Sequence, residues 1–170
     1  MTYARSLMNK QELIEHLSLV EHIEGGYFNE TYRSGYIVST DREGQERNIL
    51  TSIYYLLTDD RPIDHFHKNQ SDIIHYFHCG SPITYLILDS SGKLDKVKLG
   101  LNIAQGEKPQ LLVPGGCWKA AILEAGEFGL LGEAVAPGFD YRDMEIATVD
   151  KFQEYFPHLW QELAPYIKKS

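Results

Sequence analysis

The pattern of hydrophobic and polar residues divides the chain into a helix, a long run of short strands, and a second helical segment. Between Asn9 and His22 the apolar residues recur at helical spacing, and Asn9 with Glu12 forms a capping-box pattern. We expect this helix to end at Gly25-Gly26. From about residue 26 to 147, short runs of β-branched and aromatic residues alternate with turn residues. The expected strands are 27–34, 36–40, 48–58, 63–67, 73–79, 83–89, 94–99, 109–113, 117–123 and 128–135.

The last part of the chain, residues 148–168, returns to a helical pattern. Thr148 is the expected cap of a helix over 149–155, Pro157 breaks it, and a further helical stretch covers 158–168. The apolar stripe of this segment, with Phe152 and Phe156, is expected to pack on the barrel or on a second subunit. Many short strands at this spacing are typical of a sandwich or barrel. The sequence therefore predicts one all-β domain over residues 1–170, with a helix at each end.

The amino-acid composition limits which classes of molecule the protein can bind. The net charge of −8 argues against nucleic acid and against an anionic membrane, because both require a basic face. The N-terminus lacks the apolar core of a signal peptide, and no run approaches the roughly 18 apolar residues of a membrane span. Two cysteines, Cys79 and Cys117, do not form a disulfide framework and are expected to be buried thiols. We therefore expect a cytoplasmic protein whose partner is a small molecule.

The candidate chemistry begins at His65-Phe66-His67. Residues two apart in a strand share a face, so His65 and His67 are expected to project side by side, as two ligands of one metal ion would. His75 shares strand parity with Ile73 and can join them, whereas His78 points to the other face. Three neutral imidazoles suit Zn²⁺, Fe²⁺ or Ni²⁺. A histidine-lined pocket without metal and purely structural histidines are the alternatives.

Several phrases of the sequence carry a family resemblance. They are the run Glu-Gly-Gly-Tyr-Phe-Asn-Glu-Thr-Tyr-Arg-Ser over 24–34, the segment from Phe66-His67 to Gly80, the motif at 113–121, and Val-Ala-Pro-Gly-Phe-Asp over 135–140. In these the chain resembles the cupin superfamily, and within it a branch of predicted sugar-epimerase-like proteins. The resemblance implies a double-stranded β-helix, or jelly roll, that commonly packs as a homodimer through its sheets.

The chain departs from the general cupin pattern at two positions. The resemblance implies a metal-binding glutamate where Ile73 stands and a metal-binding histidine where Lys119 stands. Lys119 is protonated at neutral pH unless it is strongly desolvated, and a cation beside a metal ion is unfavourable. The cofactor is thus either absent or a single divalent metal (Zn, Fe or Ni) bound by His65, His67 and His75.

The resemblance also implies a chemistry without metal. Sugar-nucleotide epimerases of this fold use a histidine base, a tyrosine acid and cationic residues that stabilise an enolate. Here His65 and His67 are the base candidates and Tyr54 or Tyr55 the acid, and the sequence does not decide which tyrosine faces inward. The ligand-binding candidates are Tyr27, Arg33, Arg47, His75, Lys119 and Tyr141.

Within this set, Arg33 is favoured as a ligand contact because it lies in the most family-like phrase, and Arg47 as a structural ion pair because a charged turn precedes it. His16, His22 and His158 are interpreted as surface or core residues.

These observations predict a cupin that binds a small polar or anionic metabolite in the barrel. An epimerase- or isomerase-like enzyme is the leading hypothesis. A metal-dependent oxygenase or lyase is the second, and a binding protein without catalysis the third.

Overall fold

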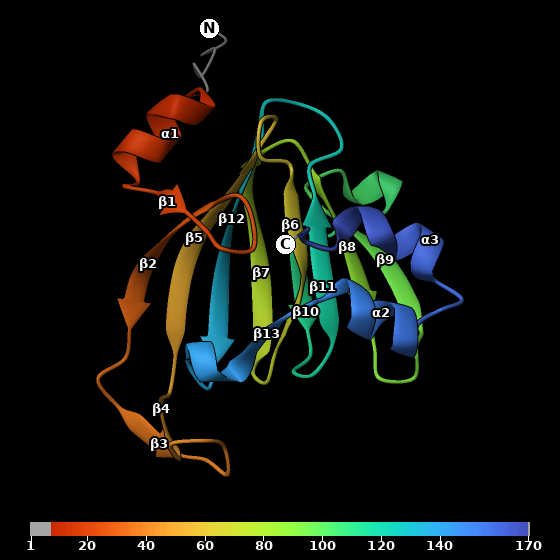
Figure 1. The fold of residues 1–170 in the computed structure, drawn as a ribbon. Helices are drawn as coiled ribbons and strands as arrows, with labels where there is room; N and C mark the ends of the chain where they lie inside the picture. Colours follow the sequence, from red (N-terminus) through yellow and green to blue (C-terminus); the bar gives the residue numbers. More distant parts are fainter. Residues whose placement is uncertain (1–7, 170) are drawn as a thin grey trace, which may run out of the picture.

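The computed structural model describes residues 8–169 and contains two antiparallel sheets that enclose a core, which confirms the predicted jelly roll (Figure 1). The first sheet has the order β1 (Val20–Glu21), β2 (Tyr27–Arg33), β5 (Thr51–Thr58), β12 (Phe128–Ala136), β7 (Asp72–Gly80), β10 (Gln110–Val113). The second has the order β13 (Met144–Ile146), β6 (Ile63–Asn69), β11 (Trp118–Ile122), β8 (Ile83–Leu88), β9 (Leu94–Leu99). Strand neighbours far apart in sequence, such as β5 and β12, make this fold dependent on long-range pairing.

The first helix is shorter than the sequence pattern predicts. The capping box of Asn9 and Glu12 is present, but α1 spans only Lys10–His16. Ser18 adopts a left-handed φ of 52°, and the Leu19 N–H donates to the Ile14 carbonyl, which is the hydrogen bond of a Schellman motif. The helix therefore ends at this motif, before Gly25-Gly26, and Val20–Glu21 is free to pair with β2 as β1.

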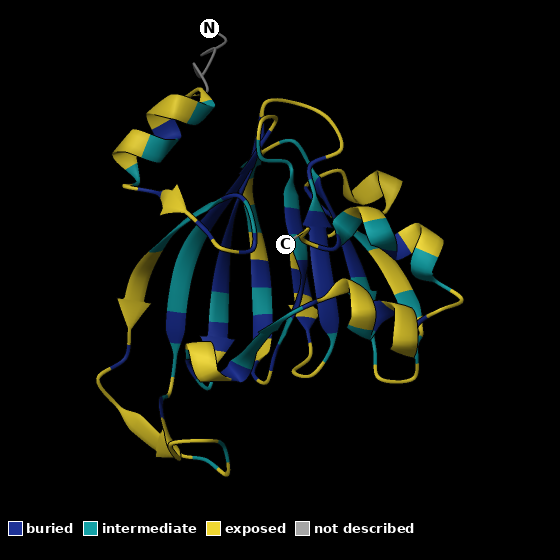
Figure 2. Cartoon of the chain, in the orientation of Figure 1, coloured by how far each residue is buried: buried dark blue, intermediate teal, exposed yellow. Residues whose placement is uncertain are grey.

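The expected strand 48–58 is interrupted near its start. Glu46–Asn48 forms β4, which pairs with β3 (Ile37–Ser39) in a separate two-stranded sheet, whereas β5 begins at Thr51 and lies inside the first sheet. In Figure 1 the β3–β4 hairpin extends away from the barrel, and Figure 2 shows that its strands are largely exposed. The hairpin is thus a separate arm of the fold.

Three apolar clusters hold the described residues together. The first fills the space between the two sheets and includes Tyr55, Tyr85 and Leu131. The second joins the outer face of the second sheet to the C-terminal helices α2 (Val149–Tyr155) and α3 (Trp160–Leu163), with Phe66 and Phe152 in contact. The third lies under α1. The apolar stripe of the C-terminal segment therefore packs on the barrel, one of the two partners expected for it.

Short 3₁₀ turns connect the larger elements, at η1 (Ile103–Gln105), η2 (Tyr141–Asp143) and η3 (Ala164–Tyr166). Cys79 and Cys117 are free thiols and are half-buried, so they are more accessible than expected. Within residues 8–169, no helix has the length and apolar character needed to cross a membrane.

Candidate functional site

A β-bulge in β6 decides which side chains of the His65-Phe66-His67 motif enter the barrel. His67 pairs with Lys119 of β11, but Asp64 pairs with Ala121, so three residue steps on β6 match two on β11. Phe66 faces outward into the cluster with α2, and Asp64 and His67 are both buried. The predicted side-by-side placement of His65 and His67 is therefore wrong, because it assumed unbroken strand alternation.

His65 fixes a loop instead of lining the cavity. Its backbone N–H and its ring Nδ1–H both donate to the Glu24 carbonyl, each over 2.8 Å. The carbonyl oxygens on either side also accept hydrogen bonds. The Gly25 carbonyl accepts one from the Tyr55 hydroxyl (2.6 Å), and the Ile23 carbonyl accepts one from the Lys168 ammonium (2.6 Å). Three successive carbonyl groups thus accept hydrogen bonds from three separate parts of the chain. These hydrogen bonds hold the loop over residues 22–26 against the barrel.

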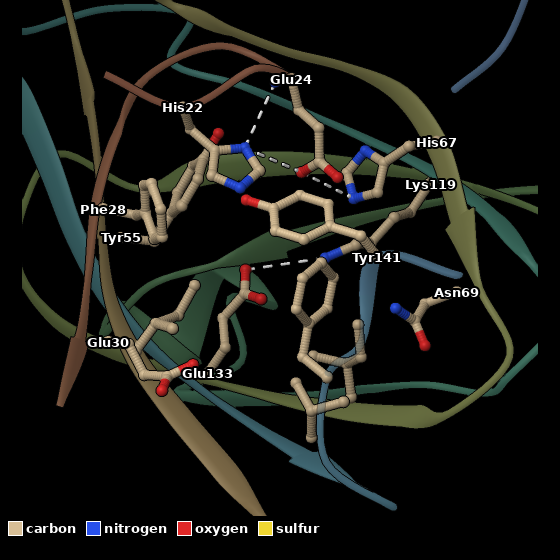
Figure 3. A pocket seen from close by; sticks show the side chains of 14 residues that line it. His22, Glu24, Phe28, Glu30, Tyr55, His67, Asn69, Lys119, Glu133 and Tyr141 are labelled. Carbon is tan, nitrogen blue, oxygen red and sulfur yellow. Dashed lines mark hydrogen bonds and ion pairs between the residues drawn. The ribbon is translucent and has the colours of Figure 1, made fainter. Parts of the chain in front are cut away.

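This loop and the barrel strands enclose a cavity of about 160 Å³ between the two sheets (Figure 3). Its lining residues are His22, Glu24, Phe28, Glu30, Ile53, Tyr55, His67, Asn69, Ile73, Lys119, Glu133, Val135, Phe139 and Tyr141. The apolar members form the walls. The ionisable members other than the exposed Glu30 and Tyr141 collect at the buried end, where their charges interact strongly because water is excluded.

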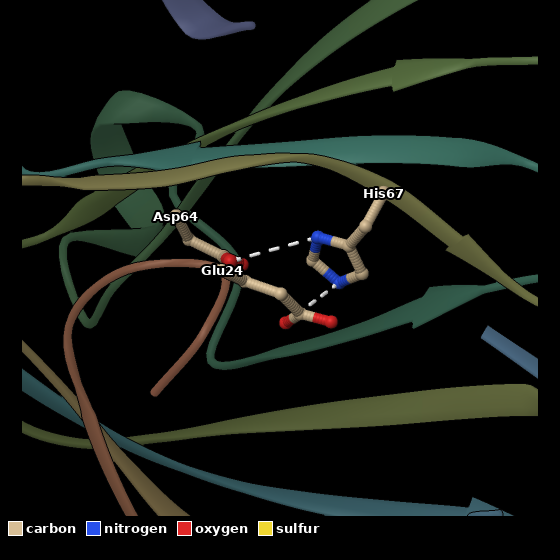
Figure 4. A group of neighbouring side chains, drawn as sticks. All are labelled: Glu24, Asp64 and His67. Atoms are coloured by element: carbon tan, nitrogen blue, oxygen red, sulfur yellow. Dashed lines mark ion pairs between the residues drawn. The ribbon is translucent and has the colours of Figure 1, made fainter. Parts of the chain in front are cut away.

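On one side of the cavity, Glu24, Asp64 and His67 form a buried acidic group (Figure 4). The His67 Nδ1–H donates to the His65 carbonyl (2.7 Å), and Nε2 lies 3.2 Å from Glu24 Oε2. Burial, and then the Asp64 charge, raise the pKa of Glu24 well above its usual range, whereas burial and the Lys119 charge lower the pKa of His67. A protonated Glu24 that donates to a neutral His67 therefore satisfies both groups.

Two neighbours complete this group. Burial raises the pKa of Asp64 to about 7, although the Lys119 charge opposes the rise. Its Oδ1 atom lies 3.6 Å from His67 Nδ1 and has no hydrogen-bond partner in the described part of the chain. His22 accepts a hydrogen bond from the Glu24 N–H at Nδ1, and burial lowers its pKa to about 4. His22 is therefore neutral at pH 7, and it belongs to the site, although sequence reasoning interpreted it as a surface or core residue.

Lys119 is the β11 partner of His67, and its side chain forms a second buried group with Glu133 and His75. Lys119 Nζ lies 3.6 Å from Glu133 Oε1 and donates to His75 Nε2 over 3.4 Å. His75 Nδ1 lies 3.1 Å from Glu133 and 3.1 Å from the Tyr85 hydroxyl. Burial alone would raise the pKa of Glu133, but the Lys119 charge and the His75 hydrogen bond lower it well below its usual range. Glu133 is therefore ionised.

The predicted tyrosines separate into those that line the cavity and those that do not. Tyr55 lines it, with 2% of its surface exposed, and Tyr141 stands at the mouth with its ring 4.9 Å from that of Phe139. Tyr54 points away and contacts the His78 ring, and Tyr27 packs beneath α1 with Arg61 over its ring. The inward member of the Tyr54-Tyr55 pair is thus Tyr55.

Neither predicted arginine lines the cavity. Arg33 binds the Glu30 carboxylate (2.7 Å) and the Phe139 carbonyl (3.2 Å), so it braces two residues of the mouth. Arg47 is buried against Asp143, with hydrogen bonds of 2.7 and 2.9 Å. Both arginines therefore have structural partners, which for Arg47 agrees with the interpretation from sequence.

Sequence reasoning missed the acidic residues of the site. Glu133 could have been noticed, because it is the single charged residue in the apolar strand Phe128–Ala136. Asp64 directly precedes the histidine motif, and Glu24 opens the first family-like phrase. Asn69 lies two residues after His67 and carries no signal that distinguishes it from a turn residue.

The residues present do not fit the three-histidine metal site that was expected. His65 lies outside the cavity, and His75 is engaged by Lys119 and Glu133. Among residues 8–169, the group of three metal-ligating side chains within reach of one another is Glu24, Asp64 and His67. The Lys119 ammonium is close enough to lower the pKa of both carboxyls, and a fixed positive charge this near to the three side chains disfavours a metal ion between them. Lys119 supplies the cation of this site.

Comparison with known proteins agrees with the fold. The family described as "Cupin superfamily (DUF985)" matches residues 11–147. An uncharacterized protein of Saccharomyces cerevisiae is 41% identical over 146 residues, which cover 78% of this chain and 72% of that protein.

Solved structures give the same result. A hypothetical protein from Leishmania major has a TM-score of 0.89 at 29% identity and covers 95% of this chain and 100% of its own. A protein from Shewanella oneidensis has a TM-score of 0.88 at 31% identity, and the match covers 96% of this chain and 100% of that protein. An oxalate decarboxylase from Bacillus subtilis shares the fold alone, with a TM-score of 0.54 at 16% identity over 88% of this chain and 37% of that chain. The chain belongs to the DUF985 family of the cupin superfamily.

Proposed function

We propose that the chain binds a small polar metabolite in the barrel and moves a proton at a carbon next to a carbonyl group, as an epimerase- or isomerase-like enzyme. The observation that carries this proposal is the pair Glu24 and Glu133, two buried carboxyls that face one cavity and whose pKa values are shifted in opposite directions (Figure 3). At neutral pH one is a proton donor and the other a proton acceptor, which is how enzymes divide acid and base work between carboxyls.

In this proposal Lys119 donates a hydrogen bond to the carbonyl oxygen of the ligand. Glu133 accepts the proton from the adjacent carbon, and the C–H electron pair becomes part of an enolate whose charge lies on the oxygen beside Lys119. Because the Lys119 charge lowers the pKa of Glu133, a ligand oxygen that engages the ammonium makes Glu133 a stronger base at this step. Glu24 then returns a proton to the carbon from its own side, which restores the carbonyl and inverts the centre.

His67 has a supporting role in this scheme. Its Nε2 faces Glu24 at 3.2 Å, so it holds the proton of Glu24 in place rather than acting as the base that the sequence predicted. The Nδ1–H bond to the His65 carbonyl fixes the ring and its tautomer. The proposal thus assigns the acid to Glu24, the base to Glu133 and the enolate contact to Lys119.

The test is hydrogen exchange in D₂O, followed by proton NMR of D-glyceraldehyde, D-xylose and D-glucose. We expect the wild type to exchange the proton next to the carbonyl of at least one of these. Glu24→Gln and Glu133→Gln should each slow the exchange by about 10²–10³-fold, the usual contribution of a positioned acid or base. Glu154→Gln, an exposed change on α2, should leave the rate unchanged. Exchange at the uncatalysed rate with all three sugars, or full exchange in both cavity variants, would refute the proposal.

The two other hypotheses make different predictions for the same samples. A metal-dependent oxygenase or lyase requires stoichiometric metal in the purified protein and loses its activity after chelation. A binding protein without catalysis shows ligand binding by NMR but no exchange. In our proposal, metal content is well below stoichiometric and chelators do not change the exchange rate.

A further inference from the structure

One polar group that lines the cavity has no hydrogen-bond partner among residues 8–169. Asn69 ends β6, is 5% exposed, and lines the cavity. Its Oδ1 accepts the Ser71 N–H over 2.8 Å, which fixes the orientation of the amide. The other terminal atom of the side chain is therefore the amide nitrogen Nδ2. This nitrogen is buried and has no hydrogen-bond acceptor among the described residues. Figure 3 shows this nitrogen turned toward Lys119.

A buried donor without an acceptor is costly, about 1–3 kcal/mol, so its persistence indicates a ligand atom that completes it. Asn69 lies two residues beyond His67 on β6, and Lys119 lies opposite His67 on β11. The Asn69 amide and the Lys119 ammonium thus offer two donors to one ligand. The amide donor is neutral, and the positive charge of the ammonium donor is already neutralised by Glu133.

The charges around the cavity disfavour an anion. Among its described lining residues Lys119 is the single ammonium or guanidinium group, whereas three carboxyls, Glu24, Glu30 and Glu133, line the same space. The nearby arginines are engaged elsewhere, Arg33 by Glu30 and Arg47 by Asp143. A phosphate or carboxylate would therefore meet a lysine that the ionised Glu133 already neutralises, and no second free cation among the described lining residues. Phosphate sites are built instead from unpaired arginine or lysine or from a helix N-terminus.

The size of the cavity sets the second limit. A volume of about 160 Å³ is close to that of an engineered cavity of about 150 Å³ that admits one benzene ring. This corresponds to roughly six carbon-sized atoms. A nucleotide does not fit inside this space, and a ligand of that size would have to extend through the mouth beside Tyr141.

From these observations we infer that the site takes an uncharged hydroxy-carbonyl compound of about three to six carbons, and that Asn69 is the specificity-determining donor to one of its oxygens. This inference rests on the proposed function for the carbonyl, but its charge and size limits come from the cavity alone. The inference narrows the class of ligand expected from the sequence, because that expectation included anionic metabolites.

Two measurements on the 170-residue chain test this inference. The first is the dissociation constant, by NMR titration, for D-glyceraldehyde and D-xylose against the charged probes D-glyceraldehyde 3-phosphate and D-glycerate. We expect at least one uncharged probe to bind at least about tenfold more tightly than either charged probe. Equal or tighter binding of a charged probe, or no saturable binding of any uncharged probe, would overturn the inference.

The second measurement uses Asn69→Asp at pH 8, which keeps the oxygen that Ser71 contacts and replaces the free donor by an acceptor. We expect at least about tenfold weaker binding of the uncharged probe. Asn102→Asp is the matched control, since Asn102 is exposed and makes no side-chain capping bond. Unchanged binding in a folded Asn69→Asp protein would remove Asn69 from the site. Should that variant not fold, the comparison of charged and uncharged probes still decides the ligand class.

The outcome is separable from that of the proposed function. Binding of an uncharged probe that depends on Asn69, without any proton exchange, would support this inference and refute the enzyme. Proton exchange on at least one of the three sugars, together with equal or tighter binding of a charged probe, would support the enzyme and refute this inference.

Discussion

At the scale of single residues, the buried acidic group makes the stability of the protein depend on pH. Burial raises the pKa of Asp64 from 3.8 to about 7 in the folded chain, so between these values the unfolded state loses a proton that the folded state keeps. The stabilisation is complete below about pH 4 and is lost as the pH rises through 7. At 1.36 kcal/mol per pKa unit, the loss is at most about 4 kcal/mol.

Asp64→Asn should remove this dependence. The amide cannot ionise, so the free energy of unfolding of the variant should fall less steeply than that of the wild type between pH 4 and pH 7. Urea unfolding at several pH values measures this difference. Parallel pH profiles for the two proteins would show that Asp64 does not titrate in this range.

The candidate site could be predicted from the sequence only in part. His67, Tyr55, Lys119 and Tyr141 were singled out and do line the cavity. His65 was misplaced, since a one-residue bulge reverses the strand parity after it and nothing local in the sequence marks the bulge. The acidic residues were missed because their grouping arises from long-range strand pairing and from a loop.

At the scale of elements, the fold was more predictable than the site. The positions of the barrel strands follow from local composition, and β9 (Leu94–Leu99) has the predicted bounds. The errors are at α1, where Ser18 takes the left-handed position that glycine usually occupies, and at the break between β4 and β5.

The loop over residues 22–26 is the element whose geometry matters most to the cavity. Gly25 has a φ of +129°, and a Cβ atom there would lie 1.9 Å from the Ile63 carbonyl oxygen. Gly25→Ala must therefore push the loop off β6 and move Glu24. We expect a loss of about 1–3 kcal/mol in the free energy of unfolding, the usual cost of such strain, together with loss of ligand binding.

Gly35→Ala is the matched control for this loop, because a Cβ atom at Gly35 meets nothing within 4 Å and its φ is not in the left-handed region. Thermal melts and NMR titration with D-xylose measure both effects. If Gly25→Ala melts and binds like the wild type, the loop does not set the position of Glu24.

At the scale of the whole molecule, the β3–β4 arm leaves an apolar surface without a partner in the described chain. Tyr36, Ile37 and Val38 are 76%, 52% and 36% exposed, on a two-stranded hairpin that extends from the barrel (Figure 2). Arg42 and Arg47 anchor the hairpin to Asp143, but these ion pairs do not cover its apolar side chains. An isolated hairpin of this kind is only marginally stable in water, and exposed apolar patches commonly mark an interface.

We therefore keep the prediction of a two-fold homodimer and propose that this arm contributes to its interface. Light scattering at micromolar concentration should give twice the chain mass of 19.4 kDa. The double variant Tyr36→Ser with Ile37→Ser should shift the protein toward the monomer, because it removes apolar area from the contact without touching Arg47 or the cavity. A matched change on another exposed apolar pair, Leu101→Ser with Ile103→Ser, should not alter the mass. A wild type that remains monomeric would rule out the dimer, and a double variant that stays dimeric would move the interface to another face of the barrel.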